Sequence, residues 1–331
     1  MNAPPRPLQS EGPSPDAAGA LAVSVVVAVR NGAHQLPGLL EALSRQTLPR
    51  EQFEVLVVDD GSTDDTERVA RESGLARVIR CGQPVGKPRA VNMGIRAAAA
   101  EVIALTDADT VPDGDWLELG LRRMRDEEVD ILGGGITVTL GDRPSVAALV
   151  DAMNWLDQRR CCEQQRFPVG ANTWARRATF ERHGLFDEEI PYYHNDAEWG
   201  KRATGAGAVL VYAPEVHVSH PPRTELRQVA EKAYRLGAGL APHRRPPFTT
   251  IGGLPPLFLS PRAYLPPRRI NLGRLAELGQ PLSRASKVRI YLAQWLFVML
   301  PMLVGDLSGE LDYARRRERR PRSTPVRPAE R

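Results

Sequence analysis

Cysteine is scarce in this chain, and so is net charge. Three cysteines among 331 residues, of which Cys161 and Cys162 are adjacent, cannot form a disulfide framework, so a reduced, cytoplasmic compartment is favoured. Lys and Arg exceed Asp and Glu by only four. A basic block at 315–320 could contact anionic lipid or nucleic acid, but a solvated tail is the favoured expectation. We therefore expect no nucleic-acid partner.

The first 20 residues lack the apolar core of a secretory signal. They contain five prolines, which predicts a disordered N-terminal tail over 1–20. The whole chain has 42% apolar and 25% charged residues, as ordinary globular proteins do. Its length allows one large domain or two smaller ones, with a substantial buried core.

Strand and helix patterns alternate four times before residue 107. Residues 21–29 form a nearly unbroken β-branched run, which is typical of a strand buried on both faces of a parallel sheet. The other predicted elements of this part are strands over 53–58, 77–80 and 102–105 and helices over 36–43, 64–73 and 89–100. The alternation indicates a doubly wound α/β domain.

The pattern is looser after residue 116. The predicted elements there are helices over 115–127 and 144–166 and strands over 131–140 and 209–212. Gly133, Gly134 and Gly135 would weaken their strand unless another group must approach its backbone closely. Eight prolines between 241 and 270 indicate an extended linker or a wrapping arm.

Two carboxylates follow the apolar strand that precedes residue 107. Asp107 and Asp109 flank Ala108 at the edge where open α/β sheets bind their ligands. An Asp-x-Asp arrangement suits Mg²⁺ or Mn²⁺, which usually hold substrate phosphates. Two surface residues before a turn are the alternative, but the buried strand that leads into them favours a cation held mainly by Asp109. His220 is a further candidate ligand, although a lone histidine is more often structural.

A nucleotide pocket is predicted at the ends of the first two strands. Asp60 could accept hydrogen bonds from a base or a ribose, and Asn31 could lie against the same base. Alternatively, Asp59, Asp60 and Ser62 form an Asx-turn and cap the next helix. The neighbouring Asp107 site favours the ligand for Asp60.

Lys87 and Arg89 open the helix that leads to the Asp107 strand. Cations are unfavourable at a helix N-terminus unless an anion such as a diphosphate binds there. A solvated charge pair is the equal alternative.

Asp196 is the candidate general base. If a helix begins near Asn195, Asp196 lies in its first turn with a carboxylate free to take a proton from an acceptor. The alternative is an N-cap at Asn195 or Asp196. For Glu198, we expect an ion pair with Arg202 at i,i+4 spacing.

Residues 290–305 contain no charged residue. The segment is shorter than the roughly 20 residues of a simple membrane span, and Gln294 and Pro301 interrupt it. Basic residues on both sides suit a helix at an anionic membrane surface, which would bring the protein to a lipid-linked acceptor. The competing hypothesis is an apolar helix buried against the catalytic domain or a second subunit.

The ordered motifs resemble those of the family 2 glycosyltransferases with the GT-A fold. The resemblance covers roughly 22–222, and the motifs that carry it are Val25–Asn31, Val57–Asp64, Gly86–Gly94, Asp107–Asp109, Gly170–Arg177, His183–Asp187, Asn195–Trp199 and His220. Two positions depart from the family pattern, because Arg30 replaces an aromatic residue and Asn195 an acidic one. The Gln-x-x-Arg-Trp motif of processive members is not found, so a single-transfer enzyme is expected.

The resemblance implies a fold, a reaction and a set of site residues. The fold is a Rossmann-like mixed sheet flanked by helices, with a catalytic domain at 21–222 and a helical or irregular C-terminal extension at 223–331. The reaction is an inverting sugar transfer from a nucleotide-diphosphate donor, with UDP preferred, to an unidentified glycan, lipid-linked or small-molecule acceptor. Asp196 is the implied base, and Asp109 the implied ligand of Mn²⁺ or Mg²⁺. The implied contacts to the nucleotide sugar are Ala28, Arg30, Asn31, Asp60, Lys87, Arg89, Asp107 and Ala108.

Two other functions remain open. A nucleotidyltransferase also uses an α/β domain with acidic metal ligands, but no glycine-rich basic signature lies near the first strand. A catalytically inactive protein that binds sugar nucleotides would be consistent with Arg30 and Asn195. In each case, we expect a cytoplasmic protein that is peripheral at the inner face of the cell membrane if 290–305 contacts lipid. A homodimer is a further alternative.

Overall fold

The computed structural model describes residues 21–125, 128–190, 194–238, 265, 272–277, 279 and 282–308. The predicted N-terminal tail, the basic block and all of the proline-rich arm except Leu265 lie outside the described residues.

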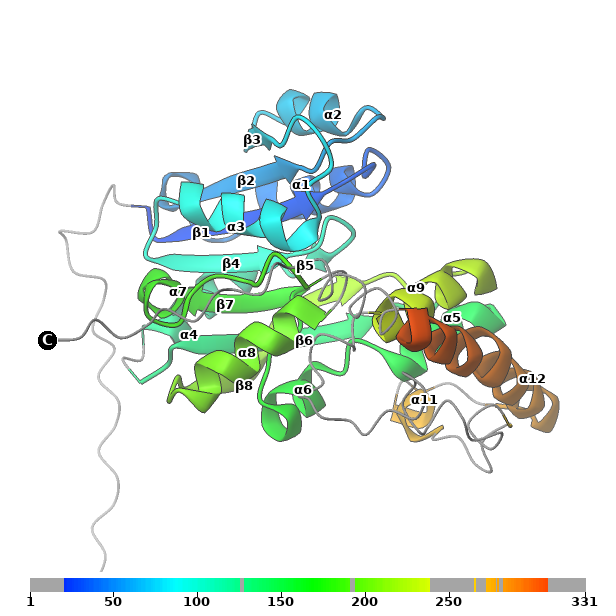
Figure 1. The fold of residues 1–331 in the computed structure, drawn as a ribbon. Helices are drawn as coiled ribbons and strands as arrows, with labels where there is room; N and C mark the ends of the chain where they lie inside the picture. Colours follow the sequence, from blue (N-terminus) through cyan, green and yellow to red (C-terminus); the bar gives the residue numbers. More distant parts are fainter. Residues whose placement is uncertain are drawn as a thin grey trace, which may run out of the picture.

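A mixed sheet of eight strands forms the centre of the described part of the chain, in the order β3-β2-β1-β4-β7-β6-β8-β5 (Figure 1). The strands are β1 (Val23–Val29), β2 (Phe53–Asp59), β3 (Ala76–Arg80), β4 (Val102–Thr106), β5 (Val111–Pro112), β6 (Ile131–Val138), β7 (Asn172–Arg176) and β8 (Leu210–His220). The first four are mutually parallel. β7 runs antiparallel to both β4 and β6, so the sheet is mixed, as the GT-A prediction requires.

Helices cover both faces of the sheet. The helices of the described part of the chain are α1 (Leu36–Ser44), α2 (Thr66–Glu72), α3 (Lys87–Ala97), α4 (Trp116–Met124), α5 (Val146–Asn154), α6 (Gln158–Gln165), α7 (Arg177–His183), α8 (Asn195–Gly205), α9 (Leu226–Ala238), α11 (Gly273–Glu277) and α12 (Arg284–Gln294). Alternate residues of β1 point to opposite faces, as the pleat of a strand requires. Val25 and Val27 pack with α1, α2 and α4, whereas Val26 packs with α3, α7 and α8. The β-branched run is therefore buried on both sides.

The glycines of β6 allow three neighbouring segments to approach its backbone. A Cβ atom would lie 2.3 Å from the Cys162 sulfur at Gly133 and 2.3 Å from the Asn172 amide nitrogen at Gly134, and a Cβ at Gly135 would lie 2.4 Å from a carbonyl oxygen. Asn172 is fully buried, and its amide nitrogen donates to the carbonyl oxygens of Gly135 and Val216 at 2.9 and 2.8 Å. The expected close approach to this strand is therefore confirmed.

Two predicted elements differ from the structure. The single helix expected over 144–166 is wrong, because Leu156 adopts a left-handed φ of 65° and separates α5 from α6. Asp157 then caps α6 by accepting from the backbone N–H of Arg160 at 3.1 Å. The strand expected at 209–212 continues to His220, which places that histidine at the edge of the sheet.

A helical layer lies at one end of the sheet, where α5, α9, α11 and α12 gather (Figure 1). α12 continues through a π-helical turn (Trp295–Met299) to give one helix over Arg284–Ser308. This π-turn precedes Pro301, whose missing N–H and ring disturb the ladder of a regular helix. Gln294 and Pro301 therefore interrupt the apolar sequence without ending the helix. The helix has 25 residues and is long and apolar enough to cross a membrane by length and composition.

Candidate active site

A cavity of about 290 Å³ opens where the carboxyl ends of the strands meet the C-terminal helices. Its polar lining comes from separate segments of the chain, and includes Lys87, Asp107, Asp196, His220, Arg223 and Lys232. Apolar side chains form the rest of the wall. The cavity therefore joins charged groups to an apolar surface, as ligand sites in proteins commonly do.

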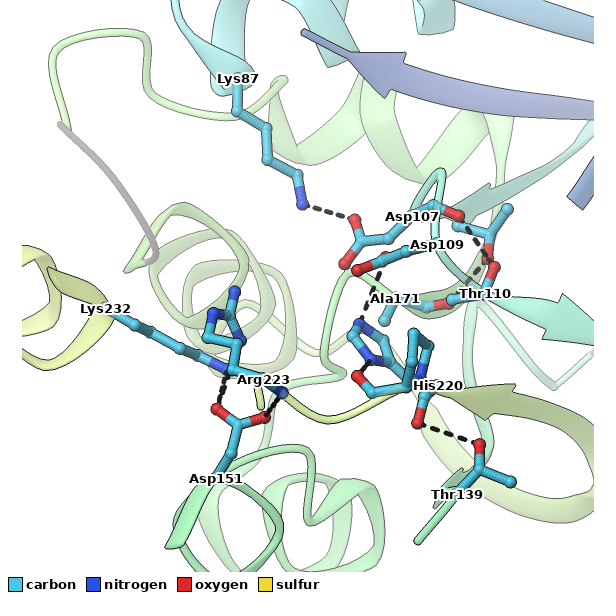
Figure 2. A network of polar contacts seen from close by, with 12 residues as sticks. Lys87, Asp107, Asp109, Thr110, Thr139, Asp151, Ala171, His220, Arg223 and Lys232 are labelled. Atoms are coloured by element: carbon cyan, nitrogen blue, oxygen red, sulfur yellow. Dashed lines mark hydrogen bonds and ion pairs between the residues drawn. The ribbon is translucent and has the colours of Figure 1, made fainter. Parts of the chain in front are cut away.

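Asp107, Asp109 and His220 form one cluster beside this cavity (Figure 2). Their candidate ligand atoms all lie within 4.8 Å of one another, and Nε2 of His220 is 3.4 Å from Oδ1 of Asp109. Nδ1 of His220 donates to the carbonyl oxygen of Pro221 at 2.7 Å. A carbonyl can only accept, so Nδ1 carries a proton, and Nε2 is the ring nitrogen on the side of the two carboxylates. Two carboxylate oxygens and one imidazole nitrogen form a donor set that suits a divalent cation.

The loop after β4 holds the two aspartates in place. The Thr110 hydroxyl donates to the backbone carbonyl of Asp107 at 2.8 Å, and the Thr106 hydroxyl contacts both Thr110 Oγ1 and the Ala171 carbonyl. The turn is thus tied to the strand that precedes it and to β7. Its carboxylates point outward from the sheet edge, as Figure 2 shows.

Lys87 forms an ion pair with Asp107. Lys87 is the first residue of α3, and its Nζ lies 2.5 Å from Oδ1 of Asp107. Burial raises the pKa of Asp107, but the Lys87 ammonium and the His220 ring lower it by more. The pKa of this carboxyl therefore lies below that of an ordinary aspartate, and the group stays ionised at a lower pH. An ionised carboxylate is the form that binds a cation.

Asp196 lies in the first turn of α8, as predicted. Its Oδ2 accepts from the backbone N–H of Gly170 at 3.2 Å and its Oδ1 from that of Ala197 at 2.8 Å. Burial nevertheless raises the pKa of Asp196 above the ordinary value, because the two backbone donors offset only part of the desolvation. A half-buried carboxylate with a raised pKa in a cavity has the properties of a general base. The expected Glu198–Arg202 ion pair is also present, at 2.6 Å.

Asp60 is placed differently from the aspartates of the cluster. It is buried, and its carboxylate accepts from the backbone N–H groups of Val85 at 2.6 Å and Gly86 at 3.1 Å. It therefore shapes the loop before α3 rather than lining the cavity. The expected Asx-turn belongs to Asp59, which accepts from the Ser62 N–H at 2.9 Å.

The remaining predicted nucleotide contacts divide into two groups. Ala28 and Lys87 line the cavity, and Ala108 is partly buried beside the cluster. Asn31 has a left-handed φ of 54°, and its side-chain oxygen accepts from the Thr63 N–H at 2.8 Å, which joins the loops after β1 and β2. Arg30 is exposed, and Arg89 lies 3.6 Å from Glu188, away from the cavity.

Sequence reasoning missed a second charged group in the same cavity. Asp151, Arg223 and Lys232 lie together on the C-terminal side, as Figure 2 shows. Two features of the sequence indicate this group. Asp151 is the lone charge in the apolar run of α5, and Lys232 shares the buried face of α9 with Val229 and Ala233.

The family model for glycosyl transferase family 2 matches residues 24–202. The chain belongs to this family. The glycosyltransferase AglE of Haloferax volcanii is 28% identical over 303 residues, which cover 89% of this chain and 97% of that protein. The pre-mycofactocin glycosyltransferase of Mycobacterium tuberculosis is 30% identical over 286 residues, which cover 80% of this chain but only 58% of that longer protein. This family 2 protein is accordingly a glycosyltransferase.

Solved structures have the same fold. The mannosyltransferase PcManGT from Pyrobaculum calidifontis, in complex with GDP-Man and Mn²⁺, has a TM-score of 0.53 at 19% identity, with 92% of this chain and 77% of that one covered. S. aureus TarS 1-349 in complex with UDP-GlcNAc has a TM-score of 0.51 at 15% identity, with 90% and 92% covered. The predicted GT-A fold of this family 2 glycosyltransferase is thereby confirmed.

Proposed function

We propose that this glycosyltransferase moves a sugar from a nucleotide-diphosphate donor to an acceptor by a single inverting displacement. The observation that carries the proposal is that Asp196 and Asp107 line one cavity with pKa values shifted in opposite directions. Opposite shifts assign opposite tasks, because one carboxylate stays ionised to hold a cation and the other is poised to take a proton.

Asp107, Asp109 and His220 would hold the divalent cation. The nitrogen donor of His220 favours Mn²⁺ over Mg²⁺, which prefers oxygen ligands throughout. The bound cation would neutralise the negative charge that develops on the leaving nucleoside diphosphate. Lys87, beside Asp107, adds a protein-borne positive charge for the same diphosphate.

Asp196 would accept the proton of the acceptor hydroxyl. As the acceptor oxygen forms its bond to the anomeric carbon, the bond from that carbon to the diphosphate oxygen breaks, and the hydroxyl proton passes to Asp196. The hydrogen bonds from Gly170 and Ala197 fix the carboxylate for this transfer. One displacement inverts the configuration of the anomeric carbon.

The donor is proposed to be a nucleotide sugar, with UDP as the preferred nucleotide. Both neighbours of the same fold were solved with nucleotide sugars, GDP-Man in one and UDP-GlcNAc in the other. Ala28, Lys87 and Asp107 are the proposed contacts on the cavity wall. Asp60 and Asn31 would act by shaping the loops around the base, and Arg30 and Arg89 would reach the donor only after rearranging.

A panel of nucleotide sugars with Mn²⁺ tests this function. Release of nucleoside diphosphate by the natural protein, abolished by Asp196→Asn, is the expected result. Release of inorganic diphosphate from a nucleoside triphosphate and a sugar phosphate would instead identify a nucleotidyltransferase. Tight binding without any turnover would identify an inactive sugar-nucleotide-binding protein.

The long C-terminal helix is proposed to contact an anionic membrane surface. One side packs on α5 and α9 through Ile290, Ala293 and Val298, whereas Val288, Leu292 and Leu296 are 59%, 45% and 44% exposed at i,i+4 spacing. The exposed basic residues at its N-terminal end are Arg284, Lys287 and Arg289. An apolar stripe with cations at one end suits an interfacial helix. The acceptor would then be lipid-linked, and a dimer that covers the same stripe is the alternative.

A further inference from the structure

Asp151 is a buried carboxylate that attracts two cations. Its side chain is 1% exposed. Arg223 donates its backbone N–H to Oδ2 at 3.1 Å and its guanidinium to Oδ1 at 3.4 Å. Arg223 thus supplies one positive charge that balances the charge of this carboxylate.

The side chain of Lys232 extends from α9 toward the same carboxylate. Its side chain is 8% exposed, and its Nζ lies 3.8 Å from Oδ1 of Asp151, which is beyond hydrogen-bonding distance. The same Nζ lies 4.4 Å from the centroid of the Trp155 ring. Among the described residues, the Lys232 ammonium thus has a carboxylate and an aromatic face nearby but no hydrogen-bond acceptor.

The charges of this group do not cancel. Within it two cations face one carboxylate. Asp107 and Asp109 also attract the Lys232 ammonium and raise its pKa, but neither lies within ion-pair distance of it. A buried charge is costly unless it is paired. Burial accordingly lowers the pKa of Lys232 to about 7, with the Arg223 guanidinium adding to the effect. A bound anion would complete the missing contacts of the ammonium.

We propose that Lys232 and Arg223 form a second anion site in the cavity, which binds a phosphoryl group. The choice of a phosphoryl anion rests on the proposed function. Trp155, Leu156 and Leu236 line the cavity beside this site, so the phosphoryl group belongs to an organic molecule rather than to a free ion. Two molecules have this chemistry, namely the donor, through its diphosphate, and a phosphorylated acceptor.

The experiment is calorimetric titration with two soluble probes in the presence of Mn²⁺. UDP represents the donor diphosphate, and phenyl phosphate represents a phosphorylated acceptor. The variants are Lys232→Met, which keeps an unbranched side chain of similar length, and Arg223→Gln. Lys287→Met, on an exposed part of α12, is the matched control, because it removes the same charge outside the cavity.

We expect Lys232→Met to weaken binding of one probe by about tenfold or more, as loss of a hydrogen bond to a charged group does. Weaker binding of UDP alone assigns the site to the donor, and weaker binding of phenyl phosphate alone assigns it to the acceptor. Unchanged affinity for both probes in Lys232→Met and Arg223→Gln would overturn the proposal. A natural protein that binds phenyl phosphate through Lys232 but does not bind UDP would contradict the proposed function and leave the anion site standing.

A second measurement covers the case in which Lys232→Met does not fold. The chain has only four lysines, so their signals after reductive ¹³C-methylation of the natural protein can be assigned by substituting the other three. The Lys232 signal should shift when its probe is added. A signal that stays fixed at saturating concentrations of both probes would exclude the site.

Discussion

Nε2 of His220 lies 3.4 Å from Oδ1 of Asp109, although the two residues come from distant parts of the chain. β8 brings the histidine to the same edge of the sheet at which β4 ends, and the Pro221 carbonyl fixes the tautomer that leaves Nε2 free to bind a cation.

Replacing either ligand should raise the Mn²⁺ concentration that the enzyme requires. For His220→Ala and Asp109→Ala we expect an increase of about 10-fold or more in the half-saturating Mn²⁺ concentration, measured by nucleoside diphosphate release. His217→Ala is the control, because His217 lies on the same strand but contacts Asp113 and Thr137. Full activity of the natural protein in EDTA would rule out the cation.

Asp196→Asn should abolish transfer and leave donor binding intact. Removing a general base costs about 10²–10⁴-fold in rate, whereas the amide can still occupy the same space. The measurements are the turnover rate and the affinity for UDP. Asp142→Asn, in an exposed loop, should keep the natural rate. Equal rates in the natural protein and Asp196→Asn would exclude Asp196 as the base.

The rate of sugar transfer should decrease as the pH is lowered, and this decrease should begin at a higher pH than it would for a base with the pKa of an ordinary aspartate. Transfer requires the ionised form of Asp196, and burial raises its pKa, so protonation removes the base at a pH above the ordinary aspartate value of about 3.9. The folded state holds this proton more tightly than the unfolded chain, so ionising Asp196 lowers stability as the pH rises from its unfolded pKa to its folded pKa. A pH–rate profile with its acidic limb at or below pH 4 would contradict this.

Polar substitutions on the exposed stripe should release the protein from anionic vesicles. We expect Leu292→Ser with Leu296→Ser to reduce co-sedimentation with phosphatidylserine vesicles severalfold, while the midpoint of thermal unfolding changes little because both side chains are exposed. Val111→Ser is the control, since Val111 is 46% exposed on the separate strand β5. If the natural protein is a dimer, the double variant is a monomer, and co-sedimentation with vesicles is the same for both, the stripe is a subunit interface.

Asn154 and Gln294 should stabilise the C-terminal helix as a pair. Each side-chain amide donates to the other, at 2.6 and 2.8 Å. Asn154→Leu leaves the Gln294 amide unpaired and should cost about 1–3 kcal/mol in the free energy of unfolding, measured in urea. The double variant with Gln294→Leu should recover most of this loss. A double variant that is less stable than either single variant would show that the two amides do not act as a pair.

The alternating first half of the fold is accessible from sequence because each strand carries its own pattern. The β-branched run of β1 and the apolar run of β4 are buried on both faces, so continuous hydrophobicity predicts them correctly. β7 was missed, since it contains Asn172, and this polar residue is buried only because other strands and side chains supply its hydrogen bonds. Such partners are a tertiary property.

The candidate site was predictable in part for the same reason. Asp107, Asp109 and Asp196 stand in motifs of fixed local spacing, so each was identified from its own segment. Asp151 and Lys232 lie on two different helices and form an ion pair only because α5 packs against α9 in the folded protein. Pairing between distant helices leaves no local pattern except a charge on an otherwise apolar face.

Gly237 of α9 and Gly305 of the long helix lie where the two helices cross. A Cβ atom at either position would lie 1.9 Å from a carbonyl oxygen of the other helix, so backbone touches backbone at this point. Lys232 stands little more than one turn before Gly237. Any side chain larger than hydrogen at either glycine would push the two helices apart and would move Lys232 away from Asp151.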